Sequence, residues 1–246
     1  MIFTQHSVCL FSSSFVFVFF FFLLMAFSID YQKLSNSNMN NIIDVAIAVA
    51  QIPDNLTLSN LISQGLPYQG NLSSSLVIID FSDFQCYLCK RYVDNTEQQV
   101  NSSYIQPDKA VYVFKHLPNR GFDSKNASIA AQCTNDQGKF WEFHKILYAN
   151  QGPIDSGWAN TENLKKFASQ IPDINTTEFN SCFNTKKYES LVDKDVTLAN
   201  SLGFTETPSF LIMNSEGSIV EKIQGPKPFP IFKSVIDNLE GKIDKN

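Results

Sequence analysis

Clustered positive charge is what this sequence lacks most plainly. Lys and Arg number 19 against 24 Asp and Glu, the formal net charge is −5 at pH 7, and no basic run exceeds two residues. Proteins that bind nucleic acid need such clusters to contact phosphates. We therefore expect no nucleic-acid partner. At 246 residues and 43% hydrophobic content, the chain has material for one large globular domain or two small ones.

The sequence also has few candidate metal ligands, with five Cys and three His in all. Cys86 and Cys89, in "FSDFQCYLCK", form the single close cysteine pair. A structural zinc site takes four ligands, commonly from two such pairs, and neither His116 nor His144 stands at a ligand spacing. We therefore expect no metal and no organic cofactor. Half a zinc site and an inert structural disulfide are the alternatives to a redox-active Cys86–Cys89 pair.

Charge is absent from residues 7–27, a Phe-rich apolar segment. As a helix, its 21 residues would rise roughly 30 Å, enough to cross a bilayer. Residues 1–28 are therefore either a signal peptide, cleaved after Ser28 in the small-residue pattern Ala26-Phe27-Ser28, or a retained membrane anchor. Both interpretations predict an extracytoplasmic protein, secreted or at the cell surface.

Export changes what the remaining cysteines indicate, because disulfides form and persist outside the cytosol. The part after the apolar segment contains an even number of cysteines: Cys86, Cys89, Cys133 and Cys182. Five Asn-x-Ser/Thr sequons are compatible with a glycosylated exterior protein, at Asn55, Asn71, Asn101, Asn126 and Asn175.

The order of predicted elements is that of a layered α/β protein. Residues 29–69, with the polar tract "SNSNMNN", are interpreted as a linker and lead-in. Strands rich in β-branched residues at 75–81 and 110–117 lack in/out alternation, which indicates burial on both faces. The intervening "CKRYVDNTEQQV" is a helix in this interpretation, so a β-α-β unit carries the cysteine pair.

A helical stretch and a second strand pair come next in the chain. Residues 123–203 show helical periodicity, with the clearest helices predicted at 138–150 and 186–203. Strands are expected at 209–213 and 218–223, joined by a turn, and the chain closes with a helix at 229–240.

The position of the cysteine pair indicates its chemistry. Cys86 stands where a strand gives way to a helix, and a helix N-terminus favours the thiolate. Cys86 is therefore the predicted nucleophile, and Cys89, nearly one turn later, the resolving thiol. Exchange would pass through a mixed disulfide with the substrate. Phe84, Tyr87 and Leu88 are predicted to form an apolar rim that binds unfolded clients, with packing in the core as the alternative for Phe84.

"IIDFSDFQCYLC" resembles the active-site segment of the DsbA-like branch of the thioredoxin superfamily, of the bacterial and archaeal extracytoplasmic type. "AAQCTNDQGKFWEFHKILY" resembles the helical insert of that family and "LANSLGFTETPSFLIMNSEGSIVEKIQG" its closing segment, so that the resemblance covers about residues 66–240. The resemblance implies a thioredoxin fold with an inserted α-helical subdomain. Its first half would be residues 70–122, the insertion 123–203 and the second half 204–246.

The resemblance also implies roles for individual residues. Thr207-Pro208 matches the cis-proline loop that faces the disulfide and presents backbone to a client peptide. Asp80 matches the buried acid beneath the active site, which could take or return the proton of Cys89. Related proteins often close the helical block with a disulfide, which here would join Cys133 to Cys182.

The sequence departs from the family at Tyr87-Leu88. The dipeptide between the cysteines often begins with Pro, and the strongest oxidants carry His second. The implied function is an oxidase that forms disulfides in secreted or surface proteins and is re-oxidised by a membrane quinone-linked thiol oxidase. A reductase or isomerase using the same pair is the alternative. A non-catalytic module that binds clients or a metal is the alternative of another class.

Overall fold

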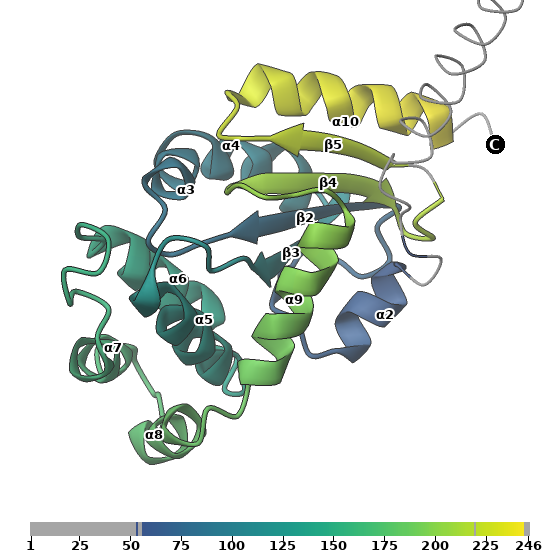
Figure 1. Ribbon diagram of the computed structural model, residues 1–246. Helices are drawn as coiled ribbons and strands as arrows, with labels where there is room; N and C mark the ends of the chain where they lie inside the picture. Colours follow the sequence, from purple (N-terminus) through teal and green to yellow (C-terminus); the bar gives the residue numbers. More distant parts are fainter. Residues whose placement is uncertain (1–52, 54–55, 219, 244–246) are drawn as a thin grey trace, which may run out of the picture. The chain divides into compact units, whose positions relative to one another are not determined.

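The computed structural model describes Pro53, residues 56–218 and residues 220–243 (Figure 1). The predicted signal or anchor segment lies outside these residues, and so does most of the predicted linker. Within them, no helix combines the length and the apolar character needed to cross a membrane. The described residues all belong to one compact unit, Ile52–Asn246.

A five-stranded mixed sheet in the order β1-β3-β2-β4-β5 forms the centre. β2 and β3 are parallel, and every other neighbouring pair is antiparallel. β2 and β3 are buried along their whole length, as their lack of alternation predicted. The strands are β1 (Tyr68–Gln69), β2 (Leu76–Ser82), β3 (Ala110–His116), β4 (Ser209–Asn214) and β5 (Val220–Gln224).

Helices cover both faces of this sheet (Figure 1). One face packs against α2 (Leu58–Ser63) and α9 (Glu189–Ser201), with Val77, Ile79 and Phe81 of β2 in that core. The other packs against α10 and a continuous helical run that starts at Tyr87 and ends at Ile105. The elements on this second face are α3 (Tyr87–Tyr92), η1 (Val93–Glu97), α4 (Gln98–Val100), η2 (Asn101–Ile105) and α10 (Phe229–Ile243).

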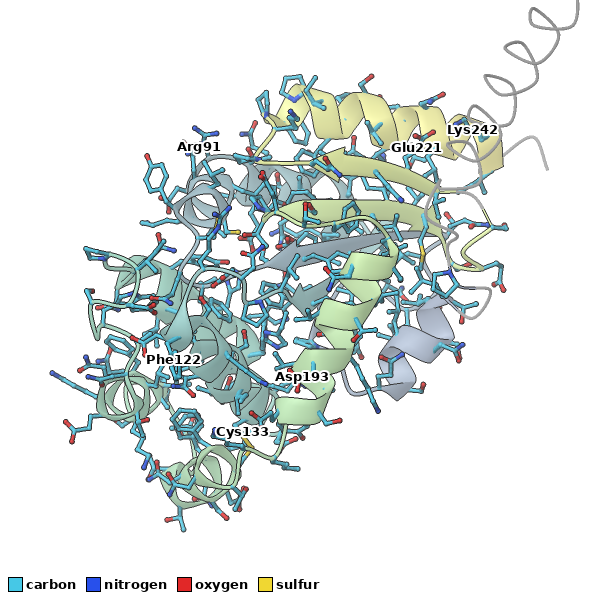
Figure 2. All side chains as sticks on the ribbon, viewed as in Figure 1. Arg91, Phe122, Cys133, Asp193, Glu221 and Lys242 are labelled. Carbon is cyan, nitrogen blue, oxygen red and sulfur yellow. A yellow bond between two sulfur atoms is a disulfide. The ribbon has the colours of Figure 1, made fainter. Side chains whose placement is uncertain are left out.

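Between β3 and β4 the chain forms a helical insertion with its own core. This core also includes Phe84, Cys89 and Phe114, so the insertion packs directly against the segment that carries the cysteine pair. A disulfide between Cys133 and Cys182 joins α5 to α8 across 49 positions (Figure 2). Closing such a loop is worth roughly 4 kcal/mol in the chain-entropy account. The helices are α5 (Phe122–Asn135), α6 (Phe140–Ala149), α7 (Thr161–Ala168) and α8 (Thr176–Asn184).

The predicted α/β class with a helical insertion is therefore confirmed, but the lead-in holds structure that the sequence did not reveal. α2 begins after Thr57, whose side chain accepts a hydrogen bond from the backbone N–H of Asn60 at 3.2 Å. β1, only two residues long, pairs Tyr68 with Val113 at the sheet edge. Both elements are too short to leave a readable periodicity.

A buried ion pair connects α9 to β3. Lys115 Nζ lies 2.6 Å from Asp195 Oδ1, and each side chain is 1% exposed. The second carboxylate oxygen of Asp195 accepts the backbone N–H of His116 at 3.0 Å. Both charges have left water, so each depends on the other for compensation.

We predict that Lys115→Met alone lowers the free energy of unfolding by about 3–5 kcal/mol, because it leaves a buried carboxylate without its cation. The double variant Lys115→Met/Asp195→Asn should lose less free energy of unfolding than either single variant. The amide oxygen introduced by Asp195→Asn can still accept the His116 N–H, and no buried charge remains. Urea unfolding measures this. Lys233→Met, in the exposed Lys233–Asp237 pair, is the control and should change the free energy by under about 0.5 kcal/mol. A double variant that loses the sum of the two single losses would contradict the prediction.

Candidate active site

The cysteine pair lies at the turn between β2 and α3. Cys86 is the residue that caps α3, with φ −80° and ψ 114°, and its carbonyl accepts the N–H of Cys89 at 3.0 Å. Both thiols are free. Cys86 keeps 3% of its surface exposed while Cys89 has none, so only Cys86 is open to a second sulfur.

The carboxylate of Asp83 holds this turn in place. It is fully buried and accepts backbone N–H groups of Gln85, Asn119 and Arg120, each at 2.8 Å. The backbone carbonyl of Asp83 accepts the N–H of Cys86 at 3.0 Å. This role was not predicted from the sequence, although an Asp just before the cysteine is a frequent turn signal, since its side chain can bond the backbone two residues on.

Two glutamine side chains connect the turn to the helical insertion. Gln151, after α6, donates from Nε2 to the carbonyls of Phe84 at 2.7 Å and Cys86 at 3.1 Å. Gln85 donates from Nε2 to Asp155 Oδ1 at 3.0 Å and accepts the Asp155 N–H at 2.8 Å. These partners are more than 60 positions away in the chain, and no sequence signal pointed to them.

The loop before β4 lies against Cys86. The Thr207–Pro208 peptide bond is cis. In its protonated form Cys86 donates from Sγ–H to the Thr207 carbonyl oxygen at 3.3 Å, and both loop residues are buried. Asn119, whose N–H is bound by Asp83, also donates from Nδ2 to the Thr205 carbonyl at 3.0 Å. Two segments that were predicted separately from the sequence are thus brought together.

The two thiols have opposite electrostatic environments. A hydrogen bond from the Cys89 thiol lowers the pKa of Cys86 to about 5, against the opposing effect of burial. The side chain of Thr207 and the N–H groups of Cys89 and Leu88 lower it further. Burial raises the pKa of Cys89 well above its usual value, and the negative charges of Cys86 and Asp80 add to that effect. Near neutral pH the reduced pair therefore holds a thiolate at Cys86 and a thiol at Cys89.

Asp80 lies in β2 on the face that the α3 run covers, and it is 1% exposed. Burial raises its pKa to about 7. Hydrogen bonds from Ser82 Oγ at 2.5 Å and from the Tyr112 hydroxyl at 2.8 Å oppose that rise. The Tyr112 hydroxyl also lies 3.4 Å from that of Tyr92, which extends the buried polar network.

A second acid, Glu97 in η1, lies near this network. Its Oε2 is buried and has no hydrogen-bond partner among the described residues. Burial raises the pKa of Glu97 to about 8, with a further contribution from the charge of Asp80. The pKa of Asp80 is the lower of the two, so Asp80 is the acid that loses its proton first as the pH rises. Nothing in the sequence had pointed to Glu97, Tyr92 or Tyr112.

The three residues of the predicted apolar rim differ in exposure. Tyr87 is 70% exposed and Leu88 is half-buried, so both are accessible at the surface. Phe84, in contrast, is fully buried and stacks on Phe114 with ring centroids 5.5 Å apart. The prediction that Phe84 binds clients is therefore wrong, because it packs in the core of the insertion.

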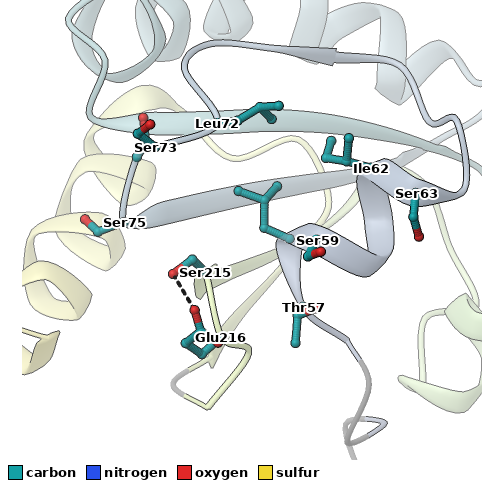
Figure 3. A pocket seen from close by; sticks show the side chains of 11 residues that line it. Thr57, Ser59, Ile62, Ser63, Leu72, Ser73, Ser75, Ser215 and Glu216 are labelled. Carbon is teal, nitrogen blue, oxygen red and sulfur yellow. Dashed lines mark hydrogen bonds between the residues drawn. The ribbon is translucent and has the colours of Figure 1, made fainter.

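A pocket of about 740 Å³ lies at the end of the sheet where β2 begins (Figure 3). Serines dominate its lining, with Ser59, Ser63, Ser73, Ser75 and Ser215 labelled in the figure. Its walls come from α2, the segment just before β2 and the β4–β5 turn, and none of its lining residues is a cysteine. A smaller groove of about 580 Å³ contains Cys86 and is therefore the one that concerns the thiol chemistry.

Fold and site together define the class: a dithiol protein with a cis-proline loop beside its accessible cysteine, on a mixed sheet with a helical insertion. Residues 63–238 match the family model described as Thioredoxin. The chain belongs to this thioredoxin family, and the DsbA-like resemblance of its sequence is confirmed by its relatives.

Curated relatives are named for disulfide chemistry. The chain is 21% identical over 151 residues to disulfide bond formation protein D of Bacillus subtilis, covering 61% of this chain and 68% of that protein. It is 26% identical over 147 residues to a Rickettsia felis protein described as a protein-disulfide oxidoreductase, covering 58% of this chain and 51% of the relative. The matched part thus spans only about half of the Rickettsia protein.

Solved structures agree in fold. Alpha-DsbA1 of Wolbachia pipientis superposes with a TM-score of 0.61 at 28% identity, covering 72% of this chain and 94% of that one. Oxidised BdbD of Bacillus subtilis gives 0.62 at 20% identity, covering 71% and 92%. Each match spans most of the solved chain, so the thioredoxin fold and its helical insertion are shared as a whole.

We predict that one thiolate forms in the reduced protein with an apparent pKa of about 5, measured by absorbance at 240 nm or by the rate of iodoacetamide alkylation against pH. The hydrogen bond from the Cys89 thiol is the largest cause of the lowered value. Cys89→Ala should therefore raise the apparent pKa of Cys86, while Cys89→Ser, which keeps a donor, should raise it less. Equal profiles for the two variants would show that this hydrogen bond is not the cause.

Proposed function

We propose that the protein is a thiol–disulfide oxidoreductase that forms disulfides in client proteins outside the cytosol. The observation that carries the proposal is the unequal pair of thiols: the Cys86 thiolate is stabilised and Cys89 is buried as a thiol. Stabilising the reduced form of a dithiol makes its disulfide a stronger oxidant. The names of the Bacillus and Rickettsia relatives support the same chemistry.

In the proposed reaction the enzyme starts with a Cys86–Cys89 disulfide. A client thiolate attacks Cys86 Sγ, which forms a mixed disulfide and releases Cys89 as a thiolate that takes a proton from Asp80. A second client thiolate then attacks the client sulfur of the mixed disulfide, and Cys86 leaves as a thiolate. The client gains one disulfide, the enzyme becomes a dithiol, and the low pKa of Cys86 makes it a good leaving group.

The remaining predicted residues take supporting roles. Thr207 and Pro208 would present their loop to an extended client segment, which pairs with it through backbone hydrogen bonds and so needs little sequence specificity. Tyr87 and Leu88 would contact apolar client side chains. The Cys133–Cys182 disulfide has a structural role in this proposal, because it lies between α5 and α8 rather than at Cys86.

Turnover requires that the reduced pair be re-oxidised, which we assign to a membrane quinone-linked thiol oxidase. Export by residues 1–28, as a cleaved signal or as an anchor, would place the enzyme with that partner. Reduced or unfolded secreted proteins are the proposed clients. Of the sequon asparagines within the described residues, Asn71 and Asn175 are exposed and could be glycosylated.

Equilibration of the full chain with glutathione buffers tests the direction of electron flow. We expect a Cys86–Cys89 potential between about −120 and −180 mV, the range of oxidants and isomerases, with thiols counted by alkylation and mass. A value near about −270 mV would identify a reductase. Full oxidase activity in a Cys86→Ser variant would remove the enzymatic proposal and leave a binding module.

The proposed proton transfer predicts that the release of Cys89 depends on pH around 7, where Asp80 titrates. Asp80→Asn should slow mixed-disulfide formation about a hundredfold at pH 6 and remove the inflection, because the proton donor is lost. Tyr112→Phe removes a hydrogen bond that lowers the pKa of Asp80, so its inflection should move above 7. Stopped-flow measurements with a peptide thiol give these profiles.

Glu97→Gln is the matched control for the loss of a buried acid. Glu97 is already mostly protonated near pH 7, so this variant should keep the inflection close to its original position. A Glu97→Gln profile that loses the inflection, with Asp80→Asn unaffected, would assign the proton to Glu97 instead.

A further inference from the structure

The groove beside Cys86 is built from three segments that are far apart in the sequence. The turn before α3 and α3 itself supply one wall, Arg120 from the β3–α5 loop supplies a second, and the α6–α7 loop supplies the third. Its lining residues are Gln85, Cys86, Tyr87, Leu88, Lys90, Arg120, Gln151, Gly152, Pro153 and Ile154. A client cysteine bonded to Cys86 therefore carries its sequence neighbours into this groove.

Much of the lining is apolar and open to solvent. Tyr87 is 70% exposed and Ile154 is 54% exposed, which places them among the few large hydrophobic side chains exposed in the described residues. Leu88 and Pro153 add to the same lining. Such a surface suits side chains of a polypeptide better than it suits a small free anion, which would leave the apolar area uncovered.

When Cys86 and Cys89 form a disulfide, the charged side chains that line the groove are all positive. Arg120 and Lys90 line it, and none of its described lining residues is a carboxylate, in a protein whose net charge is −5. Lys90 is already paired, since its Nζ lies 2.9 Å from Asp94. Arg120 takes part in none of the ion pairs of the described residues. Among the described residues, the Nε atom of Arg120 is buried and has no hydrogen-bond partner.

The nearest acids are engaged elsewhere. The Asp155 carboxylate accepts Gln85 Nε2 at 3.0 Å and the N–H of Asp123 at 3.1 Å, and it does not line the groove. The backbone of Arg120 is fixed independently of its side chain, because its N–H binds Asp83 at 2.8 Å and its carbonyl accepts Gln85 at 3.1 Å. The backbone of Arg120 is therefore fixed beside the groove that its side chain lines, and no ion pair of the described residues uses its guanidinium.

We propose that Arg120 binds a carboxylate of the client, so that this groove selects client segments carrying Asp or Glu together with an apolar side chain next to the reactive cysteine. A planar guanidinium can donate two parallel hydrogen bonds to a carboxylate, which adds geometry as well as charge. Arg120 is thus a specificity-determining residue. This inference rests on the proposed function, because it concerns clients of the same thiol.

The test uses the oxidised full chain and a short peptide dithiol in three versions, with Glu, Gln or Lys beside each cysteine and Leu next to that residue. We expect kcat/KM to be about tenfold higher for the Glu peptide than for the Gln peptide, which corresponds to about 1.4 kcal/mol. The Lys peptide should be the slowest. The preference should shrink as the salt concentration rises.

Arg120→Gln should reduce the ratio of kcat/KM for the Glu peptide over the Gln peptide to about one. Arg120→Lys should keep part of that ratio, because lysine keeps the positive charge but lacks the two parallel N–H donors of the guanidinium. Arg91→Gln is the matched control. It removes the same charge from the neighbour of Lys90, and Arg91 is exposed outside the groove (Figure 2). This control should keep the ratio.

The other outcomes are distinguishable. Equal losses of the ratio in the Arg120 and Arg91 variants would mean that only overall charge acts, which overturns the inference. A uniform loss of kcat/KM on all three peptides in Arg120→Gln would assign Arg120 a structural role. Equal rates of the unaltered protein on all three peptides would also overturn the inference while leaving the oxidoreductase function intact. No oxidation of any peptide would instead refute the proposed function.

Discussion

The buried carboxylate of Asp83 is the constraint on which the site depends. Burial raises the pKa of Asp83, and hydrogen bonds from its surroundings oppose that rise. By accepting the N–H groups of Gln85, Asn119 and Arg120, it fixes both the turn before α3 and the loop after β3. Cys86 then caps α3 at the start of the helical run, and Asn119 reaches the loop that contains Thr207.

Side chains of β2 point alternately to the two faces of the sheet, and this alternation places Asp80 beneath the cysteines. Leu76, Ile78 and Asp80 point to the face covered by the α3 run, whereas Val77, Ile79 and Phe81 point to α2 and α9. A carboxyl on the first face is buried under the cysteines with Tyr112 as its partner. Burial of Asp80 raises its pKa toward neutrality, and burial of Cys89 keeps that thiol protonated.

The sequence predicted what is encoded locally. The strands expected at 75–81 and 110–117 lie at Leu76–Ser82 and Ala110–His116, and the cysteine pair lies at the expected transition from strand to helix. Phe84 was misassigned because an apolar residue in a short turn carries no periodicity to show which way it points. Gln85, Gln151 and Arg120 were missed because their roles come from contacts across the fold, which spacing along the chain does not reveal.

The missing His between the cysteines left the direction of electron flow open, and the structure supplies other sources of thiolate stabilisation. Hydrogen bonds from the Cys89 thiol, the Thr207 side chain and the N–H groups of Leu88 and Cys89 lower the pKa of Cys86 without that His. Tyr87 and Leu88 are then free to face the groove. The Asp83 carboxylate accepts the N–H groups of both Gln85 and Arg120, so the backbone next to Cys86 and the backbone of Arg120 are held by the same side chain. In the proposed function, one buried carboxylate thus supports both the segment that binds the client and the sulfur that the client thiolate attacks.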